Sequence, residues 1–334
     1  MSKKSKKYAV LGGGGSFGLH TSKYLLENAD PAKVISIGRN PAKQRCFTMG
    51  VGEGDPRYSY HPIHINYELD MLMELLDKEK PDVIINIAAQ GEGAASFTKS
   101  WRFFDTNCTA LSKFAEELMA RDYMERFIQI GTSELYGSVH TPSKENDPIV
   151  PSSPYAASKA AFDMYLITMA RFKKFPMNII RPSNAYGSGQ QLHRVIPKAM
   201  LFGLTGRRLP LHGGGAAEKS YIHSRDFARA IYLVSEHAPL GTVYNAGPKE
   251  PTSIRRVVEL VAETMGIPFE QLCEVSGERL GQDGRYWLDS SAIKKDAGWE
   301  PEVTWQEGLQ EVLDWIKTYY DELVEMPTDF RLRA

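Results

Sequence analysis

A short region in the first half of the chain collects several side chains that can move protons. Thr132, Ser133 and Glu134 follow an apolar strand, and Tyr155 and Lys159 come four residues apart where a helix is predicted to begin. A phenol has an ordinary pKa of about 10, but a nearby ammonium favours its ionised form. Tyr155 could therefore remove a hydroxyl proton while a cofactor accepts a hydride from the same carbon.

The predicted helix places this pair on one face. Ser153 is a suitable N-cap residue and Pro154 suits the first helical position. Tyr155 and Lys159 then lie one turn apart on the same side of the helix. The same spacing is frequent on solvated helix surfaces, so the pair gains meaning only beside a dinucleotide site.

The N-terminal segment predicts such a site. An apolar strand over residues 8–11 runs into Gly12, Gly15 and Gly18, and an amphipathic helix follows. Glycines at this spacing allow a tight turn, a close approach of backbone N–H groups to a pyrophosphate, and close packing of helix on strand. The phosphates would lie at the positive end of the helix. The alternative is a glycine-rich loop that serves packing alone.

The second strand, predicted over residues 33–38, bears on the choice between NAD and NADP. An NAD site usually has a carboxylate about 20 residues past the glycines, on the ribose 2′-hydroxyl. Gly38 stands there and Arg39 follows. A guanidinium accepts a 2′-phosphate, which a carboxylate would repel. The sequence favours NADP, and NAD stays open because Arg39 could be a solvated loop cation.

Further strands predict one sheet and one ligand crevice. Apolar runs recur before Ala88 and Ala89, before Thr132 and before Asn184, with a helical stretch over about 103–119. In doubly wound sheets the ligand lies outside the carboxyl ends of the strands, so these residues should meet near Gly12. The predicted fold is α/β, a Rossmann-type doubly wound parallel sheet with a smaller C-terminal α/β substrate-binding lobe.

Composition limits the class of protein. The 334 residues are 42% hydrophobic and 24% charged, with a formal net charge of −1. This balance favours neither a nucleic-acid nor a membrane-surface partner. The basic start "MSKKSKK" precedes no apolar segment, so we expect no signal peptide. Cys46, Cys108 and Cys273 lack metal-like spacing, which predicts no metal site and a reducing, cytoplasmic location.

Taken together, the motifs resemble those of a known family. They include the glycine turn, "NIAAQ", "TSELYG", "YAASK", "RPSNAYGSGQ", "KSYIHSRDFARAIY" and "GRYWLDSSAIKKDAGWEP". The chain resembles the extended short-chain dehydrogenase/reductases of the nucleotide-sugar 4,6-dehydratase and epimerase group, in particular dTDP-glucose and GDP-mannose 4,6-dehydratases. The resemblance implies a nucleotide-diphosphate sugar as substrate and an NAD(P)-binding Rossmann domain over 1–181 plus about 222–247. A nucleotide-sugar-binding domain would comprise about 182–221 plus 248–330.

The triplet Thr132-Ser133-Glu134 is the form that the resemblance associates with dehydratases, whereas simple 4-epimerases usually keep only a hydroxyl residue there. Oxidation of the sugar at C4 would acidify the C5 hydrogen, which Glu134 could remove as water leaves C6. Thr132 would hydrogen-bond the C4 oxygen. Ser133 stands where many dehydratases have an aspartate acid. A 4-epimerase, a UDP-glucuronate-type decarboxylase and a catalytically silent dinucleotide sensor are the alternatives.

The resemblance also implies further contacts. The expected cofactor-binding residues are Gly12, Gly15, Ser16, Phe17, Gly18, Arg39, Asn40, Asn66, Ala88, Ala89, Gln90, Asn107, Tyr155 and Lys159. The expected substrate-binding residues are Glu92, Thr132, Asn184, Lys219 and Arg285. Glu92 belongs to "GEGAAS", which replaces the family's usual Ser-His-Val, and a polar loop is the other interpretation of it.

A homodimer is the expected assembly. The resemblance implies two helices per subunit at the interface, here about 103–119 and 155–172. The apolar faces Phe114/Leu118 and Phe162/Leu166/Met169 would either join the subunits or lie in the core.

Overall fold

The computed structural model describes residues 5–277 and 284–330. The first four residues of the basic segment "MSKKSKK" lie outside these ranges, and so do residues 281–283, which directly precede the motif "GRYWLDSSAIKKDAGWEP". From the N-terminus to the sheet's sixth strand, the elements are β1 (Lys7–Leu11), α1 (Ser16–Asn28), β2 (Lys33–Gly38), α2 (Arg45–Thr48), β3 (Tyr58–Pro62), α3 (Leu69–Glu79), β4 (Val83–Asn86), η1 (Ala94–Phe97), α4 (Trp101–Phe104), η2 (Asp105–Ala110), α5 (Leu111–Met119), β5 (Arg126–Ile130), η3 (Ser133–Tyr136), α6 (Pro154–Lys173) and β6 (Met177–Pro182).

The second part of the chain contains shorter strands between helices. Its elements are β7 (Asn184–Tyr186), α7 (Val195–Leu204), β8 (Leu209–His212), η4 (Gly213–Gly215), β9 (Glu218–Lys219), β10 (Tyr221–His223), α8 (Ser224–His237), β11 (Val243–Ala246), β12 (Thr252–Ser253), α9 (Ile254–Met265), α10 (Phe269–Leu272), β13 (Cys273–Ser276), α11 (Ser291–Ala297), α12 (Trp305–Thr318) and α13 (Tyr320–Val324).

The central sheet confirms the predicted fold class. Within the described residues it has seven strands in the order β11-β6-β5-β4-β1-β2-β3, all parallel. The strand order reverses between β1 and β4, where Leu11 pairs with Ile37 on one side and Asn86 on the other. A crevice for a ligand lies outside the carboxyl ends of the strands at such a reversal.

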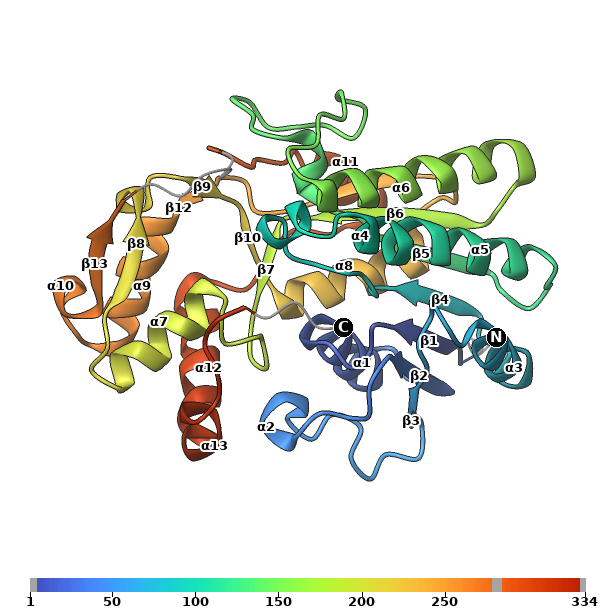
Figure 1. The fold of residues 1–334 in the computed structure, drawn as a ribbon. Coiled ribbons are helices and arrows are strands. Elements are labelled where there is room, and N and C mark those ends of the chain that lie inside the picture. The colour runs from blue at the N-terminus through green and yellow to red at the C-terminus, as the bar shows by residue number, and fades with distance from the viewer. Residues whose placement is uncertain (1–4, 278–283, 331–334) are drawn as a thin grey trace.

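Helices cover both faces of this sheet (Figure 1). Alternate residues of a strand point to opposite faces, so Tyr8 and Val10 join one core while Ala9 and Leu11 join the other. The first core includes side chains of α1, α8 and α11, and the second includes side chains of α3, α5 and α6. The strands are therefore buried on both faces, which explains their nearly continuous apolar sequences.

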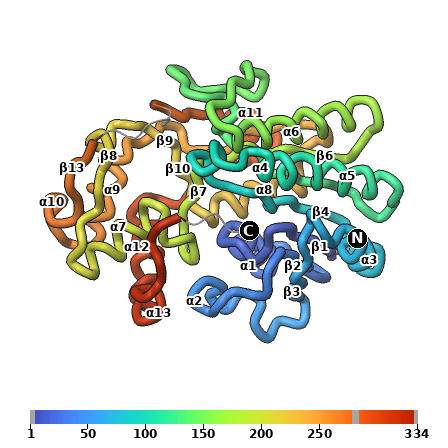
Figure 2. The backbone as a smooth tube through the Cα atoms, in the orientation of Figure 1, coloured from blue at the N-terminus to red at the C-terminus, as the bar shows by residue number. Residues whose placement is uncertain are grey.

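A smaller lobe packs beside the sheet, and its yellow to red elements gather on one side in Figure 2. Side chains of α7, α9 and α12 form its core, and the strands pair as β8 with β13 and β9 with β12. The run 175–187, which the sequence suggests as one strand, forms two strands in different sheets. β6 ends at Pro182, and β7 leaves the main sheet to pair with β10.

The short helix α2 belongs to this smaller core although it lies between β2 and β3. Cys46 is fully buried among the small-lobe side chains, and Phe47 and Met49 pack against the same cluster. The indole nitrogen of Trp315 donates to the backbone oxygen of Cys46 at 2.5 Å. A segment that follows the second strand of the sheet is thus held by α12.

The two helices expected at a dimer interface place their named apolar side chains in the core. Phe114, Leu118, Phe162 and Leu166 are at most 1% exposed and pack against the sheet. The core interpretation is therefore the correct one for these four residues, and Met169 packs, partly buried, against the same core. Among residues 5–277 and 284–330, every helix is too short or too polar to cross a membrane.

Candidate active site

The glycine turn, residues 12–18, brings three backbone segments into close contact. A Cβ atom on Gly12 would lie 2.6 Å from the backbone nitrogen of Ala88, and one on Gly18 would lie 2.3 Å from the oxygen of Gly12. Gly12 also has φ = 82°, which favours glycine. Gly15, the N-cap residue of α1, has no side chain to cap the helix. The first N–H groups of α1 and the lack of side chains fit the pyrophosphate of a dinucleotide.

The predicted cofactor residues at the end of β2 lie beside a cavity. A Cβ atom on Gly38 would lie 2.5 Å from the hydroxyl oxygen of Tyr60, which donates to the backbone oxygen of Asn40 at 2.6 Å. Tyr60 therefore occupies the space that a carboxylate side chain at position 38 would need. Arg39 is exposed at this edge.

The cavity has a volume of about 250 Å³, and Lys43 and Arg45 are among its lining residues together with Gly14 and Tyr60. Because Gly14 belongs to the glycine turn, the cavity adjoins the predicted adenosine end of the cofactor.

Two of the remaining cofactor candidates, Asn107 on η2 and Asn66 between β3 and α3, make hydrogen bonds within the structure around the crevice. Asn107 is fully buried, accepts from the backbone nitrogen of Gln90 at 2.7 Å and donates to its oxygen at 3.0 Å. Its amide also donates to the Ser158 hydroxyl at 2.9 Å. Asn66 donates to the carboxylate of Asp105 at 2.8 Å. Asn107 thus fixes the segment that follows Ala88 and Ala89.

Tyr155 and Lys159 begin α6 as the sequence predicts. Ser153 caps the helix by accepting from the backbone nitrogen of Ala156 at 3.2 Å, and Pro154 stands in the first turn. The Lys159 ammonium donates to the backbone oxygen of Ile130 at 2.5 Å. Burial lowers the pKa of Lys159 to about 8, against a smaller opposite effect of Asp163. The pair therefore lies at the carboxyl end of β5.

The charges around Tyr155 act in both directions. Burial raises the pKa of the Tyr155 phenol, and the carboxylates of Glu134 and Glu92 add to the rise. A hydrogen bond with Thr132 and the charge of Arg194 lower the pKa. The strongest cation acting on Tyr155 is thus Arg194, where the sequence suggested Lys159. Because its pKa is raised, Tyr155 would need a further positive charge, such as that of an oxidised nicotinamide, to act as a base.

Glu134 lies in the same site. Thr132 is the N-cap of η3, and its hydroxyl accepts from the backbone nitrogen of Glu134 at 3.3 Å. A Cβ atom on Gly93 would lie 3.2 Å from the Oε2 atom of Glu134, so the 91–93 loop passes directly beside the carboxylate. Ser133 is 3% exposed. The structure therefore brings together Thr132, Glu134, Tyr155 and the loop that carries Glu92.

Arg194 is a site residue that the sequence did not indicate. It is the N-cap residue of α7, and its NH1 atom lies 3.1 Å from the Oε2 atom of Glu92. His193 Nε2 lies 3.7 Å from the same oxygen. The only available signal was its place, four residues past "RPSNAYGSGQ". We call Glu92, Thr132, Glu134, Tyr155 and Arg194 the Tyr155 cluster.

A buried charge network supports α6 from below. Asp163, one turn past Lys159, accepts from the Nε of Arg181 at 3.0 Å. Arg181 also donates to the Tyr136 hydroxyl at 2.8 Å, and that hydroxyl donates to Asn245 at 2.9 Å. These bonds join α6 to β6, β11 and the "YG" segment, so they fix the position of the part of α6 that carries Lys159.

The substrate candidates of the small lobe lie on adjacent short strands. Asn184 pairs with Tyr221 in the β7–β10 ladder. Lys219 is 6% exposed, and its ammonium lies 3.5 Å from the ring centroid of Tyr286. Arg285 forms an ion pair with Glu218. The two cations are thus close in the fold, because Glu218, the partner of Arg285, directly precedes Lys219.

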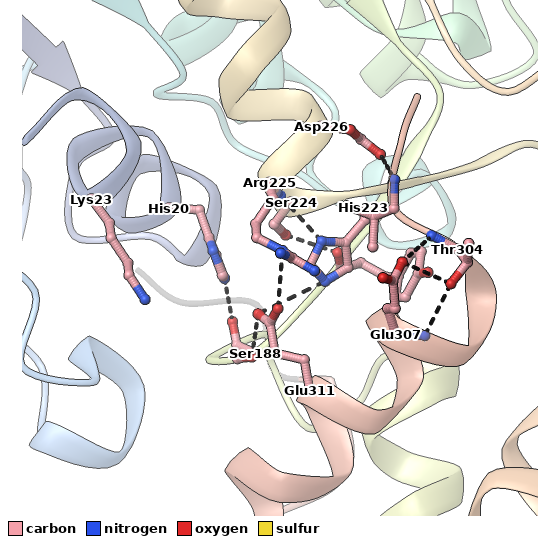
Figure 3. A network of polar contacts seen from close by, with 12 residues as sticks. His20, Lys23, Ser188, His223, Ser224, Arg225, Asp226, Thr304, Glu307 and Glu311 are labelled. Atoms are coloured by element: carbon pink, nitrogen blue, oxygen red, sulfur yellow. Dashed lines mark hydrogen bonds and ion pairs between the residues drawn. The ribbon is translucent and has the colours of Figure 1, made fainter. Parts of the chain in front are cut away.

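A second polar network ties the glycine-turn helix to the small lobe (Figure 3). The backbone oxygen of Ser188 accepts from Ser16 at 3.1 Å and lies 2.9 Å from His20 Nε2. Glu311 on α12 accepts from the Ser188 hydroxyl at 3.0 Å and pairs with Arg225 at 3.1 Å.

His223 stands at the centre of this network. It caps α8 by accepting from the backbone nitrogen of Arg225 at 3.3 Å. Burial lowers the pKa of His223 to about 4. His223 therefore has a structural use as a helix cap. No group of metal-ligating side chains occurs in the part of the chain that the structure describes.

Comparisons with known proteins point to one family. The model of the NAD dependent epimerase/dehydratase family matches residues 8–247. The low-salt glycan biosynthesis protein Agl12 of Haloferax volcanii is 31% identical over 310 residues, which are 92% of this chain and 97% of that protein.

The trifunctional UDP-glucose 4,6-dehydratase/UDP-4-keto-6-deoxy-D-glucose 3,5-epimerase/UDP-4-keto-L-rhamnose-reductase of Arabidopsis thaliana is 28% identical over 316 residues. The match covers 93% of this chain but 47% of the plant protein, so the chain spans about half of its length. The solved dTDP-glucose 4,6-dehydratase of Streptomyces venezuelae, with NAD bound, is 28% identical with a TM-score of 0.86, covering 94% of this chain and 98% of that one.

Proposed function

The chain belongs to the NAD-dependent epimerase/dehydratase family, and on that basis we propose that it is a hydro-lyase, a nucleotide-diphosphate-hexose 4,6-dehydratase. The observation that carries the proposal is Glu134 next to Tyr155 and Thr132 at the carboxyl end of β5. A 4-epimerase needs only the hydroxyl residue and the phenol. The names of two relatives, a UDP-glucose and a dTDP-glucose 4,6-dehydratase, support the same reaction and the two nucleotides to test first.

The proposed reaction gives a role to Tyr155, Thr132 and Glu134. When bound, the nicotinamide supplies a hydride acceptor for C4 and later a hydride donor for C6. Tyr155 takes the proton of the C4 hydroxyl, and Thr132 hydrogen-bonds the oxygen that becomes a ketone. The ketone acidifies the C5 hydrogen, which Glu134 removes as a proton while hydroxide leaves C6. That hydroxide is protonated to water, and the product is a 4-keto-6-deoxy sugar nucleotide.

The leaving hydroxyl requires a proton donor. Ser133 is a weak acid, so the proton that Glu134 takes from C5 is the available source for the C6 oxygen. One carboxylate then acts as base and acid in succession, either directly or through a water molecule. The protons and the hydride balance because the C5 proton leaves with the water, the hydride returns to C6, and C5 is reprotonated at the cost of the one proton that Tyr155 took from the C4 hydroxyl.

Mass spectrometry tests this function. Purified protein is incubated with UDP-glucose, dTDP-glucose, GDP-mannose and UDP-glucuronate, and the product masses are recorded. We expect the loss of one water from at least one neutral hexose. Glu134→Gln should lower that rate by about 10²-fold or more, since general base catalysis is typically worth this much.

The outcome separates the alternatives. Inversion at C4 without a mass change would identify a 4-epimerase, and loss of CO2 from the uronate would identify a decarboxylase. Cofactor binding without any change in sugar would identify a sensor.

For the cofactor we propose NADP. The cavity beside Gly14 is lined by Lys43 and by Arg45, which pairs with the Glu53 carboxylate of the same lining at 3.3 Å, and Arg39 lies at the same edge. The Tyr60 hydroxyl occupies the space of a carboxylate at position 38. Both features favour a 2′-phosphate over a free 2′-hydroxyl. NAD, which is bound in the solved relative, is the competing cofactor.

We further propose a division into two domains, 1–181 plus about 222–247 and about 182–221 plus 248–330. The separate cores of the sheet and the small lobe support this division. Cys46, which packs in the small-lobe core, and α11, whose side chains pack in a core of the sheet, are exceptions to it.

The expected homodimer also stays a proposal. The outer sides of α4 and α6 carry exposed apolar side chains, namely Trp101 at 65%, Met164 at 57% and Phe172 at 71%. A second copy of these helices would cover them, so the contact would involve other residues than the named core positions. A cytoplasmic location is proposed because Cys46, Cys108 and Cys273 are all free thiols.

A further inference from the structure

The ion pair of Glu92 and Arg194 crosses the active site from one lobe to the other. Glu92 lies in the loop after β4 of the main sheet, and Arg194 begins α7 of the small lobe. The two charged groups are 3.1 Å apart, and the Glu92 side chain is 16% exposed. The reaction described above uses neither residue. A charge pair in that position needs a different explanation.

The backbone conformation of Glu92 is unfavourable, which indicates that the surrounding structure holds the residue in this position. Its φ angle is 93°, a region that side chains other than glycine rarely adopt. Such a conformation costs free energy and is concentrated at functional sites. Gly91 and Gly93 flank it, and a Cβ atom on Gly93 would lie 3.2 Å from the Oε2 atom of Glu134, so Glu92 belongs to the loop that passes beside Glu134.

The pair also acts on the reacting group. Glu92 raises the pKa of Tyr155 and Arg194 lowers it, after the larger effects of burial, Glu134 and Thr132. Both charges therefore lie within electrostatic range of the phenol that receives the sugar proton. The carboxylates of Glu92 and Glu134 and the guanidinium of Arg194 lie around this phenol. Because the guanidinium is already paired with Glu92, it is not available to an anionic ligand.

We propose that Glu92 makes this site select hexoses with an uncharged C6 and reject C6 carboxylates by holding Arg194 in an ion pair. The inference rests on the proposed function, in which Glu134 acts at C5 and C6 therefore lies next to both carboxylates. A uronate would place a third carboxylate there. Like charges brought together in this way exclude the wrong ligand more than they strengthen the right one.

The two partners make opposite predictions. In Glu92→Gln the guanidinium of Arg194 is released, and its fork can bind a sugar carboxylate bidentately. In Arg194→Gln the Glu92 carboxylate loses its guanidinium partner, so a uronate is rejected more strongly. If the pair had only a structural role, each variant would change the affinities for the two sugars by the same factor.

Equilibrium binding tests the proposal. The full-length protein is loaded with NADPH, which prevents oxidation at C4, and titrated by calorimetry with UDP-glucose, UDP-glucuronate and UDP. The two sugars differ only at C6, and UDP reports the nucleotide site alone. We expect the wild type to bind UDP-glucose at least tenfold more tightly than UDP-glucuronate. Glu92→Gln should reduce this ratio at least fivefold, Arg194→Gln should increase it, and UDP affinity should change less than twofold.

A matched control is Arg256→Gln, which removes an exposed arginine of α9 that pairs with Glu263 at 2.7 Å. The proposal is overturned if the wild type favours UDP-glucose less than threefold, including the case in which neither sugar binds. It is also overturned if Glu92→Gln leaves the ratio within twofold of the wild type. Failure of the dehydratase function would appear instead as unchanged mass of every neutral hexose, whatever the binding ratio.

Discussion

The glycine turn and the Tyr155 cluster face the same crevice, but they are built in different ways. The turn is formed by residues 12–18, and its contacts are backbone against backbone, as where Gly18 meets the oxygen of Gly12. The Tyr155 cluster draws side chains from four separate segments and two lobes. We conclude that the cofactor side depends on residues that lack side chains, whereas the sugar side depends on charged side chains.

This difference leads to distinct expectations for substitutions. A change in the Tyr155 cluster should alter the chemistry and leave the fold intact. A change in the glycine turn should disturb cofactor binding and folding together. The following predictions test that separation, beginning with the largest expected effect.

Tyr155→Phe should have the largest effect, because it removes the hydroxyl that receives the C4 proton. We expect turnover to fall by about 10³-fold, within the usual range for general acid–base groups. NADPH affinity, measured by fluorescence, and the melting temperature should stay close to those of the wild type. A loss below tenfold, or a comparable loss of cofactor affinity, would contradict the separation of the two sides.

Gly18→Ala should show the opposite behaviour. The new methyl group would lie 2.3 Å from the Gly12 oxygen and 2.6 Å from the Gly13 Cα, both of them backbone atoms that cannot yield easily. We expect the free energy of unfolding to fall by about 1–3 kcal/mol, as for other overpacked sites.

NADPH affinity should fall at least tenfold in the same variant. Chemical denaturation and fluorescence titration measure the two effects. Gly277→Ala, where nothing lies within 4 Å of the new methyl group, is the control and should be neutral. Unchanged stability in Gly18→Ala would refute the steric account of the turn.

Lys159→Met should stabilise the ligand-free protein while abolishing turnover. Burial lowers the pKa of Lys159 to about 8 from an ordinary value of 10.5. In the pH range between these values the unfolded chain binds more protons, so the stability of the wild type rises with pH. Below pH 8 the full cost of the buried charge is present.

We expect Lys159→Met to be about 1–3 kcal/mol more stable than the wild type at pH 7, with the difference shrinking as the pH rises from about 8 towards 10.5. Urea unfolding at several pH values checks this. A variant that is less stable than the wild type at pH 7 would show that the bond from Lys159 to Ile130 outweighs the burial of its charge.

His223→Asn should have the smallest effect, and only in acid. Burial lowers the pKa of His223 to about 4, so folding holds the ring neutral and stability is lost as the pH falls from 6.5 towards 4. Asparagine keeps the capping acceptor of α8 and removes the titration.

We expect the stability difference between pH 7 and pH 5 to be about 1 kcal/mol smaller in the variant. Thermal unfolding at both pH values measures it, and His20, which is also buried and has a lowered pKa, accounts for the part that remains. An unchanged difference would assign the acid sensitivity to other groups.

The parts of the structure that the sequence could predict are those with a local pattern. The glycine spacing, the apolar strands and the Ser153-Pro154 helix start depend on neighbouring residues, and each is found where it was expected. The division of the run 175–187 into two strands was not predicted, because Pro182 continues β6 while Asn184 pairs in another sheet. Propensity alone does not reveal which partner a strand will find.

The sequence predicted the site residues that belong to motifs, but it did not predict Arg194, which the small lobe contributes. Arg194 has no pattern of its own, since a single cation before an apolar helix is common in any sequence. Its meaning comes from Glu92, which lies about one hundred positions earlier and meets it only after both lobes have folded. The same reason hid Tyr60, whose hydroxyl reaches back to the end of the neighbouring strand.

The anchoring of α2 has a consequence for protein engineering. The loop between β2 and β3 is the usual target when cofactor preference is redesigned, because it surrounds the adenosine ribose. Here that loop contributes Cys46 to the small-lobe core and receives a hydrogen bond from Trp315. A chimera that imports the corresponding loop from an NAD-dependent enzyme would leave a hole beneath α12. Point changes at Lys43 and Arg45 offer a safer route to the same switch.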